Sequence, residues 1–292
     1  MGEIRVGVAG WDYPDWNGIV YPTRPGSGFD RLAYLAGFVD TIEVNSSFYR
    51  PLDPHQTMSW VRRTRINSRF RFTAKAHRSW THDSAAIPAE VVPETLAGLA
   101  PLRSANVLGA ILVQFPQRFH RSTSAFEHLD SLLELLDGWP VVAEVRHASW
   151  DHDDVAPWFE RRNIGWCVVD QPRVGRSTVA SVARSTSRVG YVRLHGRNAA
   201  NWFRTDAGRD ERYDYLYSGE ELAPLAAAAR EISERTEELY VVQNNHFRGQ
   251  ALANALQMRH LIEGGSHPAP PDLLRAYPEL ETVTSVDQGR LF

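Results

Sequence analysis

Short apolar runs rich in β-branched residues recur along the whole chain, and helix-patterned stretches separate them. The first run is "IRVGVAG" at residues 4–10, and the stretch "AFEHLDSLLELL" carries apolar residues at three- and four-residue spacing. Apolar runs of this length are typical of buried strands. We therefore expect eight strands, at residues 5–10, 41–47, 70–76, 109–115, 141–146, 165–170, 191–195 and 240–245.

Strands that alternate with helices indicate a parallel sheet, and eight of them in 292 residues predict a single (β/α)₈ barrel of the TIM type. A doubly wound open sheet is the structural alternative. It is less favoured because no GxGxxG motif follows the first strand. The Pro-rich stretch "SHPAPPDLLRAYPEL" lies beyond the alternation, so we expect a barrel over residues 1–265 and a C-terminal tail over residues 266–292.

Polar side chains gather at the C-terminal ends of nearly all the predicted strands. In "VVAEVRHASW", Glu144 and Arg146 are two residues apart and therefore share one face of the strand. Alternate residues of a barrel strand point into the lumen, and barrel enzymes carry their active sites at the C-terminal mouth. We therefore expect a polar site at that mouth. Its predicted members on the strands are Glu43, Asn45, Lys75, Gln114, Glu144, Arg146, Asp170, Arg193, His195 and Asn244.

Aromatic residues follow several of the same strands. Flat side chains beside a polar pocket commonly stack on sugars, bases or other planar groups. The alternative for each of them is packing of one loop against another. The predicted loop members of the site are Trp11, Tyr13, Tyr49, His82, Trp150 and Arg197, with Trp11 and Trp150 at its rim.

Eight motifs, in this order, resemble those of the YecE-like family, also called domain of unknown function 72. They are "GWDYPDWNGIVYP", "IEVNSSFYR", "FRFTAKAHRSWTH", "LGAILVQFP", "AEVRHASW", "YVRLHGR", "RYDYLY" and "QNNHFRGQALANA". The resemblance covers about residues 5–262. It implies a TIM-type barrel with a pocket at its mouth, and it leaves the reaction open.

The residue types at the predicted mouth point to an anionic ligand. Arg binds carboxylate or phosphate through its planar fork, and Lys supplies a point charge. The candidate acids and bases are Glu43, Lys75, Glu144, Asp170 and His195. We therefore expect a hydrolase or lyase that acts by acid–base chemistry on a phosphorylated or acidic small molecule, sugar- or nucleotide-like, without a cofactor.

Two alternatives stay open. Glu43, Glu144, Asp170 and His195 could surround a divalent metal, as in phosphoesterases and nucleases of the endonuclease IV type, although the neighbouring cations would repel it. The barrel could also be a non-catalytic module that binds a ligand or nucleic acid. The net charge of −3 and the lack of a basic tail count against nucleic acid.

Composition narrows the class of protein further. Hydrophobic residues make up 43% of the chain and charged residues 23%, which is typical of a globular protein. The single cysteine, Cys167, excludes an internal disulfide framework and a Cys-rich zinc site, and we expect it in the core. No apolar signal region follows Met1 and no run approaches membrane-spanning length, so we expect a cytoplasmic protein without a membrane partner. The oligomeric state stays open.

Overall fold

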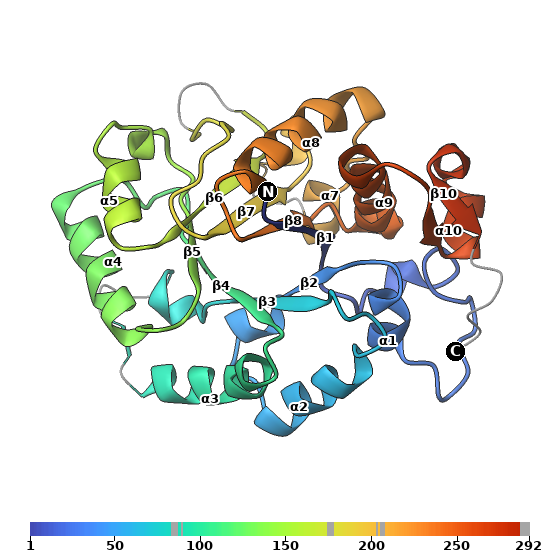
Figure 1. The fold of residues 1–292 in the computed structure, drawn as a ribbon, viewed down its shortest axis with the longest axis horizontal. Helices are drawn as coiled ribbons and strands as arrows, with labels where there is room; N and C mark the ends of the chain where they lie inside the picture. The colour runs from blue at the N-terminus through green and yellow to red at the C-terminus, as the bar shows by residue number, and fades with distance from the viewer. Residues whose placement is uncertain (83–86, 89, 174–177, 203, 205–207, 287–292) are drawn as a thin grey trace.

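Eight parallel strands close into one barrel in the computed structural model, which describes residues 1–82, 87–88, 90–173, 178–202, 204 and 208–286 (Figure 1). The strands follow one another around the barrel in chain order, and β8 pairs with β1. They are β1 (Glu3–Ala9), β2 (Thr41–Val44), β3 (Arg71–Lys75), β4 (Leu108–Gln114), β5 (Val141–Glu144), β6 (Gly165–Asp170), β7 (Val189–Leu194) and β8 (Glu238–Gln243). The closed barrel confirms the predicted fold and excludes the open sheet.

The ends of the observed strands lie within three residues of the predicted ones. The largest difference is at β2, which ends at Val44 because the chain then enters a 3-10 turn, η2 (Ser46–Phe48). Similar turns follow four other strands: η1 (Pro14–Trp16), η3 (Arg78–Trp80), η4 (Ala148–Trp150) and η5 (Phe247–Gly249). These turns fold the loops back over the C-terminal end of the barrel.

Helices surround the barrel (Figure 1). They are α1 (Arg31–Ala36), α2 (Pro54–Arg63), α3 (Val91–Ser104), α4 (Thr123–Leu135), α5 (Val155–Arg161), α8 (Gly219–Ser233) and α9 (Gln250–Glu263). The alternation is incomplete after β6, because the described residues 171–173 and 178–188 form no helix. Val179 of this segment packs into the core in place of a helix. No described helix is both long enough and apolar enough to cross a bilayer.

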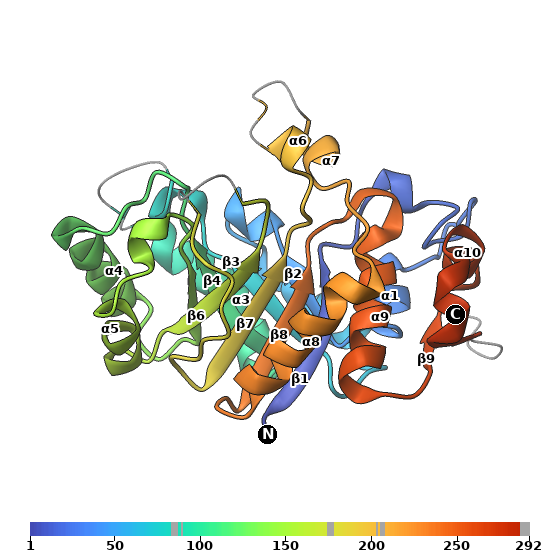
Figure 2. The same cartoon turned by 90° about the horizontal axis from the view of Figure 1, so that it is seen from above.

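Two short helices, α6 (Ala199–Trp202) and α7 (Arg209–Arg212), stand above the barrel after β7, at the end opposite the N-terminus (Figure 2). Parallel strands all end on that side. The C-terminal mouth of the barrel therefore lies beneath α6 and α7.

The strand side chains form two layers, as the two-residue alternation requires. The outer layer packs against the helices and includes Val8 and Leu194. The inner layer fills the lumen and includes Cys167 and Tyr240. Arg5 closes the N-terminal end of the lumen, where its buried guanidinium donates to Glu3 at 2.6 Å and to Glu238 at 3.1 Å. The lumen is therefore filled by side chains, and a ligand can reach it only from the mouth.

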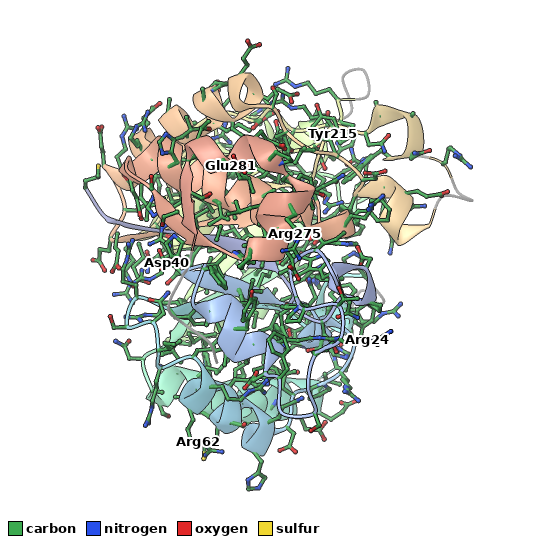
Figure 3. All side chains as sticks on the ribbon, turned by 90° about the vertical axis from the view of Figure 1, so that its right-hand side faces the viewer. Arg24, Asp40, Arg62, Tyr215, Arg275 and Glu281 are labelled. Atoms are coloured by element: carbon green, nitrogen blue, oxygen red, sulfur yellow. The ribbon has the colours of Figure 1, made fainter. Side chains whose placement is uncertain are left out.

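The Pro-rich residues after α9 fold against α9, on the face shown in Figure 3. They form β9 (His267–Ala269), α10 (Pro271–Ala276), the 3-10 helix η6 (Pro278–Thr282) and β10 (Thr284–Val286). Strands β9 and β10 pair in parallel, separately from the barrel. Leu273 and Leu280 are fully buried in the main core. This segment is therefore an ordered addition to the helical layer.

Candidate functional site

Polar side chains from the ends of six strands meet at the C-terminal mouth. Tyr191 belongs to the inner layer, so Arg193, two residues further along β7, also faces the lumen. The same two-residue step places Glu144 and Arg146 on the lumen side of β5, after Val142. We call the resulting set the mouth cluster. It consists of Glu43, Lys75, Gln114, Glu144, Arg146, Arg193, His195 and Asn244, all of them residues predicted for the site.

Arg193 is the centre of the mouth cluster. Its side chain is 1% exposed, and it donates to Glu43 Oε1 from Nη2 at 2.7 Å and to Glu144 Oε2 from Nη1 at 2.5 Å. Nη1 also donates to Gln114 Oε1 at 3.0 Å. Both carboxylates are fully buried and therefore need a compensating charge. One guanidinium thus stabilises two buried carboxylates.

Glu144 is held from two sides. Its Oε1 accepts a hydrogen bond from Arg146 Nε at 2.7 Å, opposite the bond from Arg193. Burial acts to raise the pKa of Glu144, but the charges of Arg193 and Arg146 outweigh burial and hold the pKa well below its usual value. Glu144 is therefore an ionised carboxylate between two guanidinium groups.

His195 is a fully buried, uncharged member of the cluster. Asn244 Nδ2 lies 2.8 Å from its Nδ1, while its Nε2 lies 3.4 Å from Arg193 Nη1, 3.5 Å from Arg146 Nη2 and 3.6 Å from Glu144 Oε1. Burial and the charge of Arg193 lower the pKa of His195 to about 3. At neutral pH the imidazole is therefore uncharged and carries a single ring N–H.

The lowered pKa of His195 predicts that stability depends on pH. Between pH 6.5, its ordinary pKa, and about pH 3, the unfolded chain binds a proton that the folded protein does not. The free energy of unfolding therefore falls as the pH is lowered through this range, by up to about 1.4 kcal/mol per pH unit from this group. We expect urea unfolding at pH 7 and pH 5 to show a smaller loss of stability for His195→Asn than for the wild type. An equal loss in the two proteins would contradict this assignment.

Lys75 ends β3 and lies half-buried at the mouth. Its Nζ lies 4.6 Å from the centre of the Phe48 ring. The nearby carboxylates of Glu43 and Glu144 form their ion pairs with arginines instead. Burial and the charge of Arg193 lower the pKa of Lys75 from 10.5 to about 8. A fraction of the Lys75 side chains is therefore neutral amine at neutral pH.

A polar layer beneath the cluster was not among the predicted site residues. The Tyr191 hydroxyl donates to Glu43 Oε2 at 2.9 Å and lies 2.7 Å from Thr73 Oγ1. Tyr191 and Thr73 precede Arg193 and Lys75 by two residues on their strands. The same alternation that predicted the cluster, followed one step deeper into the lumen, would have found them.

The aromatic residues expected at the rim occupy different environments. Trp150 is fully buried, and its Nε1 donates to the Phe119 carbonyl oxygen at 2.8 Å, so its predicted place at the rim is wrong. The reason is packing: its indole stacks on Phe119 and meets Phe126 edge-on, both at 5.4 Å between ring centres. Trp11 is half-buried and lies edge-on to Trp60 at 5.1 Å between ring centres. Tyr49 is 68% exposed.

Two rings after β7 contact the cluster from above. Trp202 and Tyr213 lie 5.7 Å and 6.1 Å from the His195 ring, centre to centre. Tyr213 also lies 5.3 Å from the His246 ring, which stacks on the buried Tyr13 at 4.5 Å. Tyr213 was not predicted as a site residue. Its contact depends on the path of the chain through α6 and α7, which no local pattern indicates.

Asp170 and Arg197 lie apart from the mouth cluster. Asp170 accepts hydrogen bonds from Arg197 Nε and Nη2, both at 2.9 Å, and from the Tyr217 hydroxyl at 2.7 Å. Both residues line a cavity of about 520 Å³ between β6, β7 and α8. The expectation that Asp170 and Arg197 belong to the mouth is therefore wrong. The reason is register: Val169 faces the lumen, so its neighbour Asp170 faces the helices.

The remaining predicted residues lie beside the cluster. Asn45 is half-buried directly after β2. His82 lines a cleft of about 630 Å³ together with Arg118, His120 and the start of α4. Phe48 connects this cleft to the mouth, because its ring lies 5.1 Å from the His82 ring and 4.6 Å from Lys75 Nζ.

The predicted metal ligands do not converge. Within the described part of the chain, no group of three or more His, Cys, Asp or Glu residues is placed to hold a metal ion. Glu43 and Glu144 direct their carboxylate oxygens at Arg193, and Asp170 faces the helices. A guanidinium between two carboxylates uses the oxygen atoms that a divalent metal would need. The mouth cluster therefore does not fit the metal-dependent alternative.

Comparison with known proteins places the chain in a family. The family model described as protein of unknown function DUF72 matches residues 5–275. The chain belongs to the DUF72 family. It is 29% identical over 276 residues to the UPF0759 protein YunF of Bacillus subtilis (strain 168), which covers 89% of this chain and 95% of the relative.

Solved DUF72 structures have the same fold. A DUF72 family protein of Thermotoga maritima MSB8 is similar with a TM-score of 0.78 and 32% identity, over 89% of this chain and 99% of that one. A DUF72 family protein of Enterococcus faecalis V583 has a TM-score of 0.78 and 25% identity, over 89% and 95% of the two chains. Membership confirms the family that the motifs resemble.

The mouth cluster of this DUF72 protein has an excess of positive charge. Lys75, Arg146 and Arg193 contribute three formal positive charges, and Glu43 and Glu144 contribute two negative ones. His195 adds none, because its pKa is about 3. The sum is one positive charge when Lys75 is protonated.

Proposed function

We propose that this DUF72 protein is an enzyme that acts by acid–base chemistry on an anionic small molecule at the barrel mouth. The observation that carries the proposal is the excess positive charge of the mouth cluster. The two cations nearest solvent are Arg146, whose side chain is 16% exposed, and Lys75, which is half-buried. A ligand anion beside them would balance a charge that the cluster does not balance itself.

The cluster offers separate groups for binding and for proton transfer. Arg146 uses Nε and Nη2 on Glu144, and Nη1 forms no hydrogen bond with a described residue, so it is available to a phosphate or carboxylate. Glu144 is ionised and can accept a proton, while the neutral His195 carries one ring N–H that could be donated. This division suits hydrolysis or elimination.

Features around the cluster favour a phosphorylated or acidic compound with a flat or sugar-like part. Trp202 and Tyr213 present rings above His195, where a sugar or base could stack. The neighbouring cleft holds Arg118 and His82, which could bind a second anionic group. The proposed substrate is therefore a sugar- or nucleotide-like anion.

Binding of inorganic phosphate tests the anion site directly. We expect Arg146→Ala to weaken phosphate binding at least about tenfold in isothermal titration calorimetry, because a hydrogen bond from a guanidinium to phosphate is charge-assisted. Arg188→Ala is the matched control, since this exposed arginine precedes β7 at the opposite end of the barrel. Equal phosphate affinity in the wild type and Arg146→Ala would refute the anion site. Turnover of a panel of phosphorylated sugars, sugar acids and nucleotides then tests whether the protein is an enzyme.

A further inference from the structure

The chain contains 31 arginines and a single lysine, and that lysine is Lys75. Arginine serves the other cationic positions throughout the protein, including the ion pairs at its surface. An arginine side chain stays protonated at any working pH and is a poor nucleophile, whereas a desolvated lysine amine is a good one. Among the 32 Lys and Arg positions, only position 75 therefore carries an amine that can act as a nucleophile.

The surroundings of Lys75 do not hold it as a fixed cation. In the described structure its Nζ forms no hydrogen bond or ion pair, and it lies over the face of Phe48, 4.6 Å from the ring centre. The carboxylates of Glu43 and Glu144 are bound by Arg193 and Arg146. Arg193 and Arg146 also disfavour a further positive charge nearby, and with burial they lower the pKa of Lys75 to about 8. The amine is consequently available at the mouth.

We propose that Lys75 forms an imine with the carbonyl carbon of an anionic aldehyde or ketone, such as a 2-oxo acid or the open-chain form of a phosphorylated sugar. This inference rests on the proposed function, because Arg146 would bind the anionic group of the same molecule. It narrows the substrate class from anions in general to anions that carry a carbonyl group.

The step balances without any further reactant. Neutral Nζ attacks the carbonyl carbon, a C–N bond forms, and the C=O electron pair moves to oxygen, which takes up a proton. Loss of that oxygen as water breaks the C–O bond and forms the C=N bond. Starting from the ammonium form, two of its three protons leave with the water and the third remains on the iminium nitrogen. The ring N–H of the uncharged His195 can supply a proton to the departing oxygen.

An imine at Lys75 would allow the ionised Glu144 to act as a base. An iminium withdraws electrons from the adjacent carbon, so a proton on that carbon becomes more acidic. Glu144 lies in the same cluster and is held as a carboxylate by Arg193 and Arg146. A base that stays ionised can accept the proton released there. Proton abstraction beside the iminium is thus the acid–base step that this arrangement suits.

Reductive trapping tests the imine on the full chain. The wild type is incubated with glyoxylate, an anionic aldehyde, and sodium cyanoborohydride, which converts an imine into a stable secondary amine. Peptide mass spectrometry then compares the modification of Lys75 with that of the Met1 α-amino group, the only other primary amine of the chain. We expect Lys75 to be modified at least about tenfold faster than Met1.

A relocated lysine provides the matched control. The double variant Lys75→Arg/Arg62→Lys also has one lysine, now on the exposed surface of α2, where Figure 3 labels Arg62. Its new lysine should be modified at least about tenfold more slowly than Lys75 of the wild type. If Lys75 reacts no faster than this relocated lysine, the imine inference is wrong, whatever the phosphate titration shows.

A comparison with acetaldehyde, a neutral aldehyde, tests the imine and the anion site independently of each other. If glyoxylate modifies Lys75 faster than acetaldehyde does, and Arg146→Ala removes the difference, both proposals are supported. If the two aldehydes modify Lys75 equally fast, and both do so faster than they modify the relocated lysine, the imine inference stands and the anionic substrate class is wrong.

Discussion

Replacing Arg193 by methionine is expected to destabilise the protein by about 3–5 kcal/mol, because the change leaves two buried carboxylates without their shared partner. Arg193 is 1% exposed and binds Glu43 at 2.7 Å and Glu144 at 2.5 Å. Each carboxylate is fully buried, and the Tyr191 hydroxyl and Arg146 replace only part of the lost interaction. Urea unfolding monitored by tryptophan fluorescence measures the loss.

A second substitution shows whether the loss comes from the buried charges. Arg193→Met/Glu43→Gln removes the charge of Glu43, the carboxylate left without an arginine partner, so it should recover part of the stability lost in Arg193→Met. Arg188→Met, a change of the same size at an exposed residue before β7, should alter the free energy of unfolding by less than about 0.5 kcal/mol. If Arg193→Met costs no more than Arg188→Met, Arg193 does not neutralise the cluster.

The strand-borne part of the site could be predicted because its geometry repeats every two residues. Once Glu144 and Arg146 are placed on one strand of a barrel, the alternation puts both on the same face, and the polar mouth of the lumen is where two such charges find partners. No information on loops or packing is needed. Glu43, Lys75, Gln114, Arg193 and His195 follow from the same rule, and the structure brings them together.

Asp170 shows the limit of that rule. A polar residue at the C-terminal end of a strand lies at the mouth of the barrel. Whether its side chain faces the lumen or the helices depends on whether it falls on an odd or an even position of the strand. On β6 the inward residues are Cys167 and Val169, which look like ordinary core residues, and the conspicuous Asp170 is the outward one. A one-residue error in register exchanges the two faces. Reading the parity from the apolar residues would have placed Asp170 correctly.

The loops could not be predicted in this way, because tertiary packing decides their conformation. Trp150 follows β5 as closely as Trp11 follows β1, yet Trp150 is fully buried and Trp11 is half-buried. Tyr213 reaches His195 only because α6 and α7 stand over the mouth (Figure 2). The number of residues between an aromatic side chain and its strand therefore says little about its contacts.

Glu144→Gln is expected to reduce turnover of the natural substrate by about 10²–10⁴-fold, because the amide cannot accept the proton that an ionised carboxylate accepts. The substitution keeps the size of the side chain and one hydrogen-bond acceptor. It removes the charge that pairs with Arg193 and Arg146, so we also expect a loss of stability of about 1–3 kcal/mol. Binding of inorganic phosphate should persist, because Arg146 is still present to bind the anion.

Asp170→Asn separates the chemical effect from the loss of stability. Asp170 is also a buried carboxylate, 6% exposed, and it too is paired with a guanidinium, that of Arg197, but on the helix side of the sheet. The two variants should lose comparable stability, whereas only Glu144→Gln should lose turnover. Turnover measured with the substrate found in the panel, at a temperature where both variants are folded, decides between the two roles. If Asp170→Asn lowers turnover as much as Glu144→Gln, or if Glu144→Gln retains wild-type turnover, then Glu144 and Arg146 are a structural ion pair and the base must be sought elsewhere in the mouth cluster.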